Sequence, residues 1–373
     1  MEDKKVNIQN DTNSYSPLGV GGFYSGKRVL ITGHTGFKGS WLAIWLNELG
    51  AEVIGVALDP YTDRDNYVLS GIGNKIKADL RGDVRDGQFL KDVFQKYQPE
   101  IVFHLAAQPL VRLSYDIPVE TYEVNVMGTI HVMEAIRATD SVKVAVMITT
   151  DKCYENKEQL WGYRENEAMG GYDPYSSSKG AAEIAIASWR RSFFNPEEYA
   201  KHGKSIASVR AGNVIGGGDW ALDRIIPDCI KALEAGKPIE IRSPKAIRPW
   251  QHVLEPLRGY MLLASKMWEN PIKYCEGWNF GPRTESIATV WDVATKVIAG
   301  YGSGELQDLS DPNALHEAKL LMLDISKAKF QLGWEPRLNI DQTVEMTVDW
   351  YKRYKNEDVS SVCLDQIKTF VGK

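Results

Sequence analysis

Two polar side chains near the middle of the sequence have the spacing of a proton-abstracting pair. Tyr175 and Lys179 are four residues apart in a segment, residues 174–194, that is expected to be helical, so both side chains face one side of the helix. An ordinary tyrosine has a pKa of about 10, and a nearby ammonium group favours the phenolate. The pair is therefore predicted to take the proton of a hydroxyl group while hydride leaves the carbon that carries it.

Three further polar residues follow a predicted strand at residues 142–149. They are Thr150, Asp151 and Lys152, and the carboxyl ends of strands face the ligand in open α/β sheets. Thr150 is expected to hydrogen-bond the reacting hydroxyl group. Asp151 is a candidate acid, and Lys152 is a candidate acid or base.

A glycine-rich turn precedes these residues in the chain. The predicted strand at residues 27–32 leads into Gly33-His-Thr-Gly-Phe-Lys-Gly39, and a helix is expected from residue 39 to residue 49. Glycines at such a strand-to-helix turn let a dinucleotide pyrophosphate approach the backbone at the helix N-terminus. The turn supplies the candidate cofactor contacts Gly33, Thr35, Gly36, Phe37, Lys38 and Gly39.

The expected dinucleotide is NAD. Asp59, after the predicted strand at residues 52–58, is a candidate partner of the adenosine ribose, although it could equally be a turn residue before Pro60. No arginine occupies that strand end to bind a 2′-phosphate, and Arg64 follows a little later. Further candidate cofactor contacts are Asp83, Val84, Leu105, Ala106 and Ala107, together with Tyr175 and Lys179.

The elements that must position these residues alternate between strand and helix. Additional helices are expected at residues 87–97 and 119–138, and additional strands at 100–105 and 205–210. This order predicts an α/β fold with a Rossmann-type, doubly wound parallel sheet. Later segments rich in Gly, Pro and Trp predict a smaller C-terminal α/β lobe that closes the site.

The predicted organisation has three parts. Residues 1–25 form a flexible tail, and residues 26–212 form an NAD-binding Rossmann domain that carries the catalytic residues. Residues 213–373 form mainly a substrate lobe, with some segments returning to the main domain.

Composition narrows the class of protein further. The chain has 373 residues and a formal net charge of -5, which disfavours nucleic acid as a partner. No apolar run is long enough to cross a membrane, no secretory signal is visible, and the cysteines have no metal-ligand spacing. A cytoplasmic enzyme without a metal is therefore expected.

Several motifs together resemble the extended short-chain dehydrogenase/reductase family, and within it the sugar-nucleotide 4,6-dehydratases. Besides the glycine turn, they are His104-Leu-Ala-Ala-Gln-Pro-Leu-Val-Arg112, Thr149-Thr-Asp-Lys-Cys-Tyr-Glu-Asn156, Tyr175-Ser-Ser-Ser-Lys179, Arg210-Ala-Gly-Asn-Val-Ile-Gly-Gly-Gly-Asp-Trp220 and Arg248-Pro-Trp-Gln-His252. The resemblance runs from about residue 26 into the C-terminal region. One departure is informative, because dTDP-glucose and GDP-mannose dehydratases carry Asp-Glu where this chain has Asp151-Lys152. The CDP-glucose branch has lysine there, which favours that branch and leaves the identity of the proton-abstracting group open.

The resemblance implies dehydration of a nucleotide sugar by internal redox chemistry. Tyr175 would take the C4 hydroxyl proton, Asp151 would protonate the leaving C6 hydroxyl, and Lys152 would remove the C5 proton. The implied product is a 4-keto-6-deoxy sugar, used for deoxysugar supply to surface polysaccharide such as O-antigen. A dehydratase or 4-epimerase acting on a GDP-, dTDP- or UDP-linked sugar remains an alternative.

The resemblance also implies contacts and partners. Candidate substrate contacts are Gln108, Asn213, Arg224 and Arg248, with Arg248 suited to a bidentate grip on the nucleotide pyrophosphate. A homodimer is expected, with the helices at residues 119–138 and 174–194 pairing across subunits, because both carry apolar residues on more than one face.

Overall fold

The computed structural model describes residues 22–283, 286–310 and 320–372. Most of the predicted flexible tail, residues 1–21, lies outside the described residues. Tyr24, inside the predicted tail, is buried, and its hydroxyl donates a hydrogen bond to the carbonyl of Met261 at 2.8 Å. The folded part therefore begins before residue 26.

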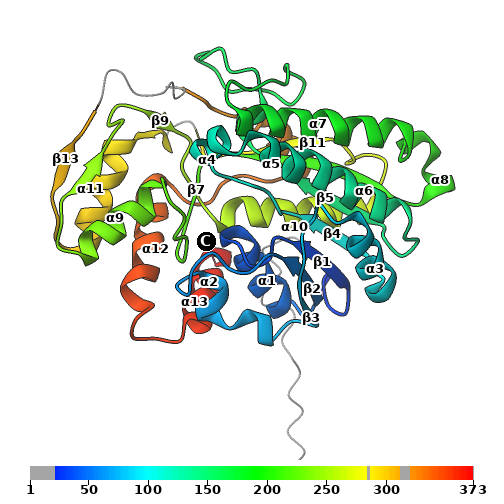
Figure 1. Ribbon diagram of the computed structural model, residues 1–373, viewed down its shortest axis with the longest axis horizontal. Coiled ribbons are helices and arrows are strands. Elements are labelled where there is room, and N and C mark those ends of the chain that lie inside the picture. Colours follow the sequence, from blue (N-terminus) through cyan, green and yellow to red (C-terminus); the bar gives the residue numbers. More distant parts are fainter. Residues whose placement is uncertain (1–21, 284–285, 311–319, 373) are drawn as a thin grey trace, which may run out of the picture.

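A parallel sheet of seven strands forms the centre of the molecule, in the order β11-β6-β5-β4-β1-β2-β3 (Figure 1). Its strands are β1 (Arg28–Thr32), β2 (Glu52–Ala57), β3 (Ala78–Arg81), β4 (Ile101–His104), β5 (Val144–Ile148), β6 (Ser205–Ala211) and β11 (Gly277–Phe280). Because β1 lies between β4 and β2, the winding direction of the sheet reverses there, and ligands of such sheets bind outside the carboxyl ends at this point.

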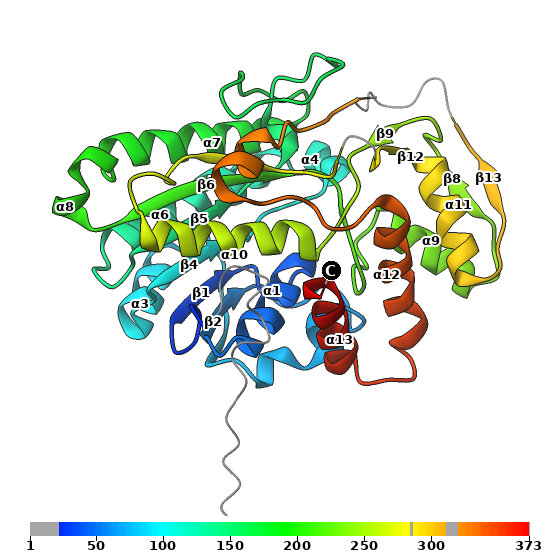
Figure 2. The same ribbon diagram turned by 180° about the vertical axis from the view of Figure 1, so that it is seen from behind.

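Helices cover both faces of the sheet. One face carries α1 (Phe37–Glu48), α10 (Leu254–Glu269) and α13 (Val359–Val371), seen from behind in Figure 2, and α12 (Ile340–Arg353) stands beside α13 next to the smaller lobe. The other carries α3 (Gly87–Tyr97), α5 (Pro118–Tyr122), α6 (Gly128–Arg137) and α7 (Pro174–Ser192). Alternate strand side chains feed separate cores, since Val29 and Ile31 pack toward the first set and Leu30 toward the second.

The remaining elements lie largely after β6. They include β7 (Val214–Ile215), α9 (Ile225–Glu234), β8 (Ile239–Ile241), β9 (Ile247–Arg248), β10 (Gln251–His252), β12 (Ala288–Thr289), α11 (Val290–Tyr301) and β13 (Leu306–Asp308). Short helices also occur before β6, namely α2 (Asn66–Ser70), α4 (Val111–Asp116) and α8 (Tyr199–His202). The helices α9 and α11 with the β8–β13 pair form a smaller α/β lobe at the left of Figure 1, whereas β11 returns to the main sheet beside β6.

These features confirm the predicted fold class, a doubly wound parallel sheet with a smaller α/β lobe. One predicted helix differs in detail, because the segment at 119–138 contains a π-helical turn, Glu123–Met127, between α5 and α6. In the part of the chain that the structure describes, every helix is too short or too polar to cross a membrane.

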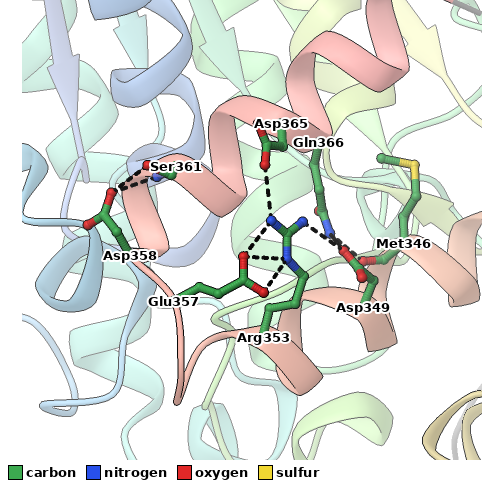
Figure 3. A network of polar contacts seen from close by, with 8 residues as sticks. All are labelled: Met346, Asp349, Arg353, Glu357, Asp358, Ser361, Asp365 and Gln366. Carbon is green, nitrogen blue, oxygen red and sulfur yellow. Dashed lines mark hydrogen bonds and ion pairs between the residues drawn. The ribbon is translucent and has the colours of Figure 1, made fainter.

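Arg353 ties the last two helices together (Figure 3). Its guanidinium contacts Asp349 and Glu357 on the α12 side and donates to Asp365 of α13 at 3.0 Å. Helix α12 in turn reaches the carboxyl edge of the sheet, because the Tyr351 hydroxyl donates to the carbonyl of Asp219 at 2.7 Å. The C-terminal hairpin thus supports a loop beside the candidate site.

Candidate active site

A cleft of about 820 Å³ lies over the carboxyl ends of the strands, between the sheet and the smaller lobe. Its walls come from the β1–α1 turn, the ends of β3, β4 and β5, the start of α7, and the segment after β6. Elements far apart in the sequence therefore meet at one site, as the Rossmann topology requires.

The glycine turn forms one wall of the cleft, and its glycines expose the backbone there. Gly33 has φ +78°, and a Cβ there would lie 2.7 Å from the backbone nitrogen of Ala106. A Cβ at Gly39 would lie 2.1 Å from the carbonyl oxygen of Gly33, so neither position accepts a side chain without movement. The whole predicted set Gly33, Thr35, Gly36, Phe37, Lys38 and Gly39 lines the cleft at the N-terminus of α1. This arrangement fits a dinucleotide pyrophosphate.

The adenosine end differs from the prediction at one residue. Asp83, Val84, Leu105, Ala106 and Ala107 line the cleft, but Asp59 does not. Strand β2 ends at Ala57, so Leu58 faces the cleft, while the Asp59 side chain is 88% exposed and pairs with Arg81 at 3.0 Å. Sequence reasoning missed Arg81 because this cation belongs to the neighbouring strand β3.

The predicted catalytic side chains meet where β5 and α7 converge. Asp173 caps α7 by accepting from the Ser176 backbone at 2.9 Å, which places Tyr175 in the first turn. The Tyr175 hydroxyl shares a hydrogen bond with the Thr150 side chain, and Thr150 Oγ1 donates to Asp151 Oδ1 at 2.9 Å. A hydrogen-bonded chain therefore runs from Tyr175 through Thr150 to Asp151.

Burial governs the titration of this group. Asp151 is 1% exposed, and burial raises the pKa of its carboxyl, which favours the protonated form that an acid needs. Its Oδ2 atom has no hydrogen-bond partner among the described residues. Burial also raises the pKa of Tyr175 to about 12, although the Thr150 hydrogen bond and the charge of Arg224 act in the opposite direction.

Lys179 lies one helical turn after Tyr175 on α7. Burial lowers the pKa of Lys179 to about 8, while the nearby Glu183 carboxylate acts to raise it. Lys179 is buried and is not among the residues that line the cleft. The role of Lys179 in favouring the Tyr175 phenolate therefore stays a prediction.

Lysine side chains reach the same part of the cleft from two further elements. Lys152 is half-buried in the 3₁₀ turn Asp151–Cys153 and lines the cleft. Lys38 lines it from the glycine turn, and burial, together with the charges of Lys179 and Arg224, lowers its pKa to about 8. A negatively charged ligand bound in this part of the cleft would neutralise the charges of both lysines.

The predicted substrate contacts divide into two groups. Asn213, Arg224 and Arg248 line the cleft, and Arg224 is held by the Asp219 carboxylate at 2.7 Å. Gln108 does not line it. The Gln108 amide is used inside its own loop, where it accepts from the Leu110 backbone and donates to Thr121 at 2.9 Å. Gln108 thus shapes the loop and does not face the cleft.

Other residues at the cleft were missed or placed differently by sequence reasoning. Asp223, at the rim, pairs with Arg242 at 2.9 Å and with Arg112 at 3.6 Å. The Arg242 side chain is 45% exposed at this rim. His104, at the end of β4 and outside the cleft lining, is buried between Thr32 and Thr129, and burial lowers its pKa to about 3.

Comparison with known families agrees with this architecture. Residues 30–347 match the model of the GDP-mannose 4,6 dehydratase family, and the chain belongs to that family. A CDP-glucose 4,6-dehydratase from Salmonella typhimurium is 50% identical over 341 residues, which cover 91% of this chain and 95% of the relative. A dTDP-glucose 4,6-dehydratase from Xanthomonas campestris pv. campestris is 24% identical over 86% of this chain and 92% of its own length. The resemblance noted from the motifs is thereby confirmed.

Solved structures share the fold. A dTDP-glucose 4,6-dehydratase from Streptomyces venezuelae, with NAD and TYD bound, superposes with a TM-score of 0.73 at 21% identity, covering 89% of this chain and 99% of that one. A UDP-glucose 4-epimerase from Thermus thermophilus in complex with NAD gives the same TM-score at 23% identity, covering 88% and 99%. Both dehydratases and epimerases therefore occur on this scaffold.

Proposed function

We propose that this protein is an NAD-dependent CDP-glucose 4,6-dehydratase, a hydro-lyase that converts CDP-D-glucose to CDP-4-keto-6-deoxy-D-glucose and water. The observation that carries the choice of a dehydratase is the hydrogen-bonded chain from Tyr175 through Thr150 to Asp151, which joins a candidate base to a buried acid. The 50% identity to the Salmonella typhimurium enzyme supports CDP-glucose as substrate.

NAD is the cofactor that the glycine turn fits. The crowding at Gly33 and Gly39 leaves bare backbone at the N-terminus of α1, and structural neighbours were solved with NAD. Bound NAD would take hydride from C4 of the sugar and return it to C6. We assign to its contacts the glycine turn, Asp83, Val84 and residues 105–107 of the cleft lining, and Asp59, Tyr175 and Lys179 stay candidate contacts.

The chain's own residues move the protons. Tyr175 takes the C4 hydroxyl proton, and Thr150 steadies its phenol oxygen. The resulting ketone acidifies the C5 proton, which Lys152 removes. Asp151, whose raised pKa favours a bound proton, protonates the C6 hydroxyl so that it leaves as water. Arg224 and Arg248 are the proposed partners of the nucleotide pyrophosphate, and Asn213 borders the sugar.

The reaction is tested by incubating the purified protein with CDP-glucose. We expect a product two hydrogens and one oxygen lighter, with the base-sensitive absorbance of a 4-keto sugar and no net NADH. Release of stoichiometric NADH, or no product from CDP-glucose, would reject the proposal. A panel of dTDP-, GDP- and UDP-glucose or mannose tests the nucleotide, and Tyr175→Phe serves as the inactive control.

A 4-epimerase is the second candidate, because UDP-glucose 4-epimerases share the fold. An epimerase needs the Tyr175 base but has no water to release, so Asp151→Asn would leave its turnover nearly intact. Loss of turnover in that variant together with loss of water from the substrate would favour the dehydratase.

The proposed setting is a cytoplasmic homodimer that supplies a deoxysugar for surface polysaccharide. All four cysteines are free and buried, which supports a reducing compartment. Apolar side chains remain exposed along α5 and α7, among them Val119 at 71% and Ile184 at 59%. A second copy covering this face would bury them. Sedimentation giving a monomer at micromolar concentration would exclude the dimer.

A further inference from the structure

A buried carboxylate joins the two elements that carry the proposed catalytic groups. Glu183 lies on α7 one turn after Lys179 and is 3% exposed. Its Oε1 accepts from Thr149 Oγ1 at 2.5 Å, and its Oε2 accepts from Ser208 Oγ and from Arg210 Nη2, both at 2.8 Å. Thr149 immediately precedes Thr150, so one side chain connects the end of β5 with the catalytic helix.

Arg210, which supplies the positive charge opposite Glu183, is itself fixed by hydrogen bonds. Arg210 Nη1 donates to the Tyr154 hydroxyl at 2.6 Å, and Tyr154 donates to Asn279 Oδ1 of β11 at 2.8 Å. Burial would raise the pKa of Glu183, but Arg210 and the hydroxyl donors hold it below its ordinary value, so the carboxylate is charged. A buried ion pair contributes little net stability compared with apolar residues of the same volume. Its place one helical turn from Lys179, with a hydrogen bond from Thr149, points to a role in positioning the site.

We propose that Glu183 is a positioning residue, which places a carboxylate one helical turn from Lys179 and fixes the end of β5 so that Thr150 and Asp151 stay aligned with Tyr175. This inference rests on the proposed function. Glu183 does not line the cleft and so acts only through the residues that it holds.

The groups around Lys179 affect the pKa of its ammonium group. Glu183 faces it from the same helix and Cys153 from the turn after β5, and both act to raise its pKa. Lys38 from the glycine turn and His104 from β4 are also within electrostatic reach of the same ammonium. Burial lowers the pKa of Lys179 to about 8, so the Glu183 charge extends the pH range over which Lys179 stays protonated.

The test compares Glu183→Gln with Ser208→Ala. Glutamine keeps the shape and one acceptor for Arg210, and Thr149 can turn its hydroxyl toward Val209 O, 3.2 Å away, to accept from the new amide. Ser208→Ala removes one hydrogen bond from the same carboxylate but leaves its charge. Two quantities are measured across pH, kcat/KM with CDP-glucose and the affinity for NAD by calorimetry.

We expect the alkaline limb of both profiles to move about one pH unit lower in Glu183→Gln, as loss of a nearby opposite charge requires, and to stay in place in Ser208→Ala. An unmoved limb in Glu183→Gln, with activity lowered equally at every pH, would overturn the proposal and leave a structural role. Glu183→Asp, which retains the charge, should keep the wild-type limb at lower kcat, and an alkaline limb that moves lower in Glu183→Asp would overturn the proposal even should the glutamine variant not fold. A wild-type protein that makes no product rejects the proposed function, while the NAD profiles still test Glu183.

Discussion

Replacing Asp151 with asparagine tests whether its carboxyl is the acid that releases water. The side chain is buried, Oδ1 accepts from Thr150, and Oδ2 is free of protein partners among the described residues, so it can serve the substrate. Asparagine keeps the size of the side chain and an acceptor for Thr150. It has no proton to give to a leaving hydroxyl group.

The expected cost follows from the usual contribution of a positioned acid. General acid catalysis contributes about 10²–10⁴-fold, or about 3–5 kcal/mol of transition-state stabilisation, so kcat for water loss should fall by that factor. Oxidation at C4 uses Tyr175 and should survive. Stopped-flow absorbance should therefore show enzyme-bound NADH accumulating with CDP-glucose in Asp151→Asn. Turnover within about threefold of wild type would refute the assignment of Asp151 as the acid.

The same variant makes a prediction for stability. Burial raises the pKa of Asp151 above its unfolded value of about 3.9. A carboxyl of this kind binds its proton more tightly in the folded state, so its favourable contribution is present below pH 4 and is lost as pH rises through the folded pKa. Asparagine does not titrate. As pH rises from 4 toward neutrality, the melting temperature of Asp151→Asn should rise relative to that of wild type. A fall in the melting temperature of Asp151→Asn relative to wild type over this range would contradict the raised pKa of Asp151.

Three further substitutions test other parts of the structure. Tyr175→Phe should lower kcat by about 10²–10⁴-fold and weaken NAD binding by less than about tenfold in calorimetry, since only one candidate hydrogen bond to the cofactor is lost, and a retained kcat would refute the phenol as the base. Gly39→Ala places a Cβ 2.1 Å from the carbonyl oxygen of Gly33, so NAD affinity should fall at least about tenfold, and unaltered affinity would mean that the turn does not bind the pyrophosphate. Arg353→Ala removes the contacts with Glu357 and Asp365 (Figure 3) and should cost about 1–2 kcal/mol in urea unfolding with kcat unchanged, and a kcat loss would couple the α12–α13 hairpin to the site.

Much of the fold could be predicted because its signals are local. Apolar strands alternating with amphipathic helices fix a parallel sheet, and the glycine turn needs only its own spacing and the strand before it. β11 was harder to assign, since Gly277–Phe280 is short and joins the sheet only by pairing with β6. Nothing in its neighbours along the chain indicates that partner.

At the site, too, the residues placed by local signals were the ones that could be predicted. Residues placed by strand ends or by helix periodicity, such as Thr150 and Tyr175, lie in the cleft as expected. Asp59 and Gln108 lie outside the cleft lining, because their positions depend on where β2 ends and on hydrogen bonds inside one loop. Glu183 carries no sequence signal beyond its place one turn after Lys179. Its importance comes from donors on β5 and β6 that only the fold brings together.

The central claim is that Tyr175, Thr150 and Asp151 serve a reaction in which hydrogen leaves C4 and returns to C6 of the same sugar. CDP-glucose deuterated at C4, mixed with unlabelled substrate, tests this directly when the products are analysed by mass spectrometry and NMR. We predict deuterium at C6 of the 4-keto product, retained within the molecule that carried it. Deuterium recovered in solvent, in free NADH or at C4 of an epimerised sugar would contradict the claim.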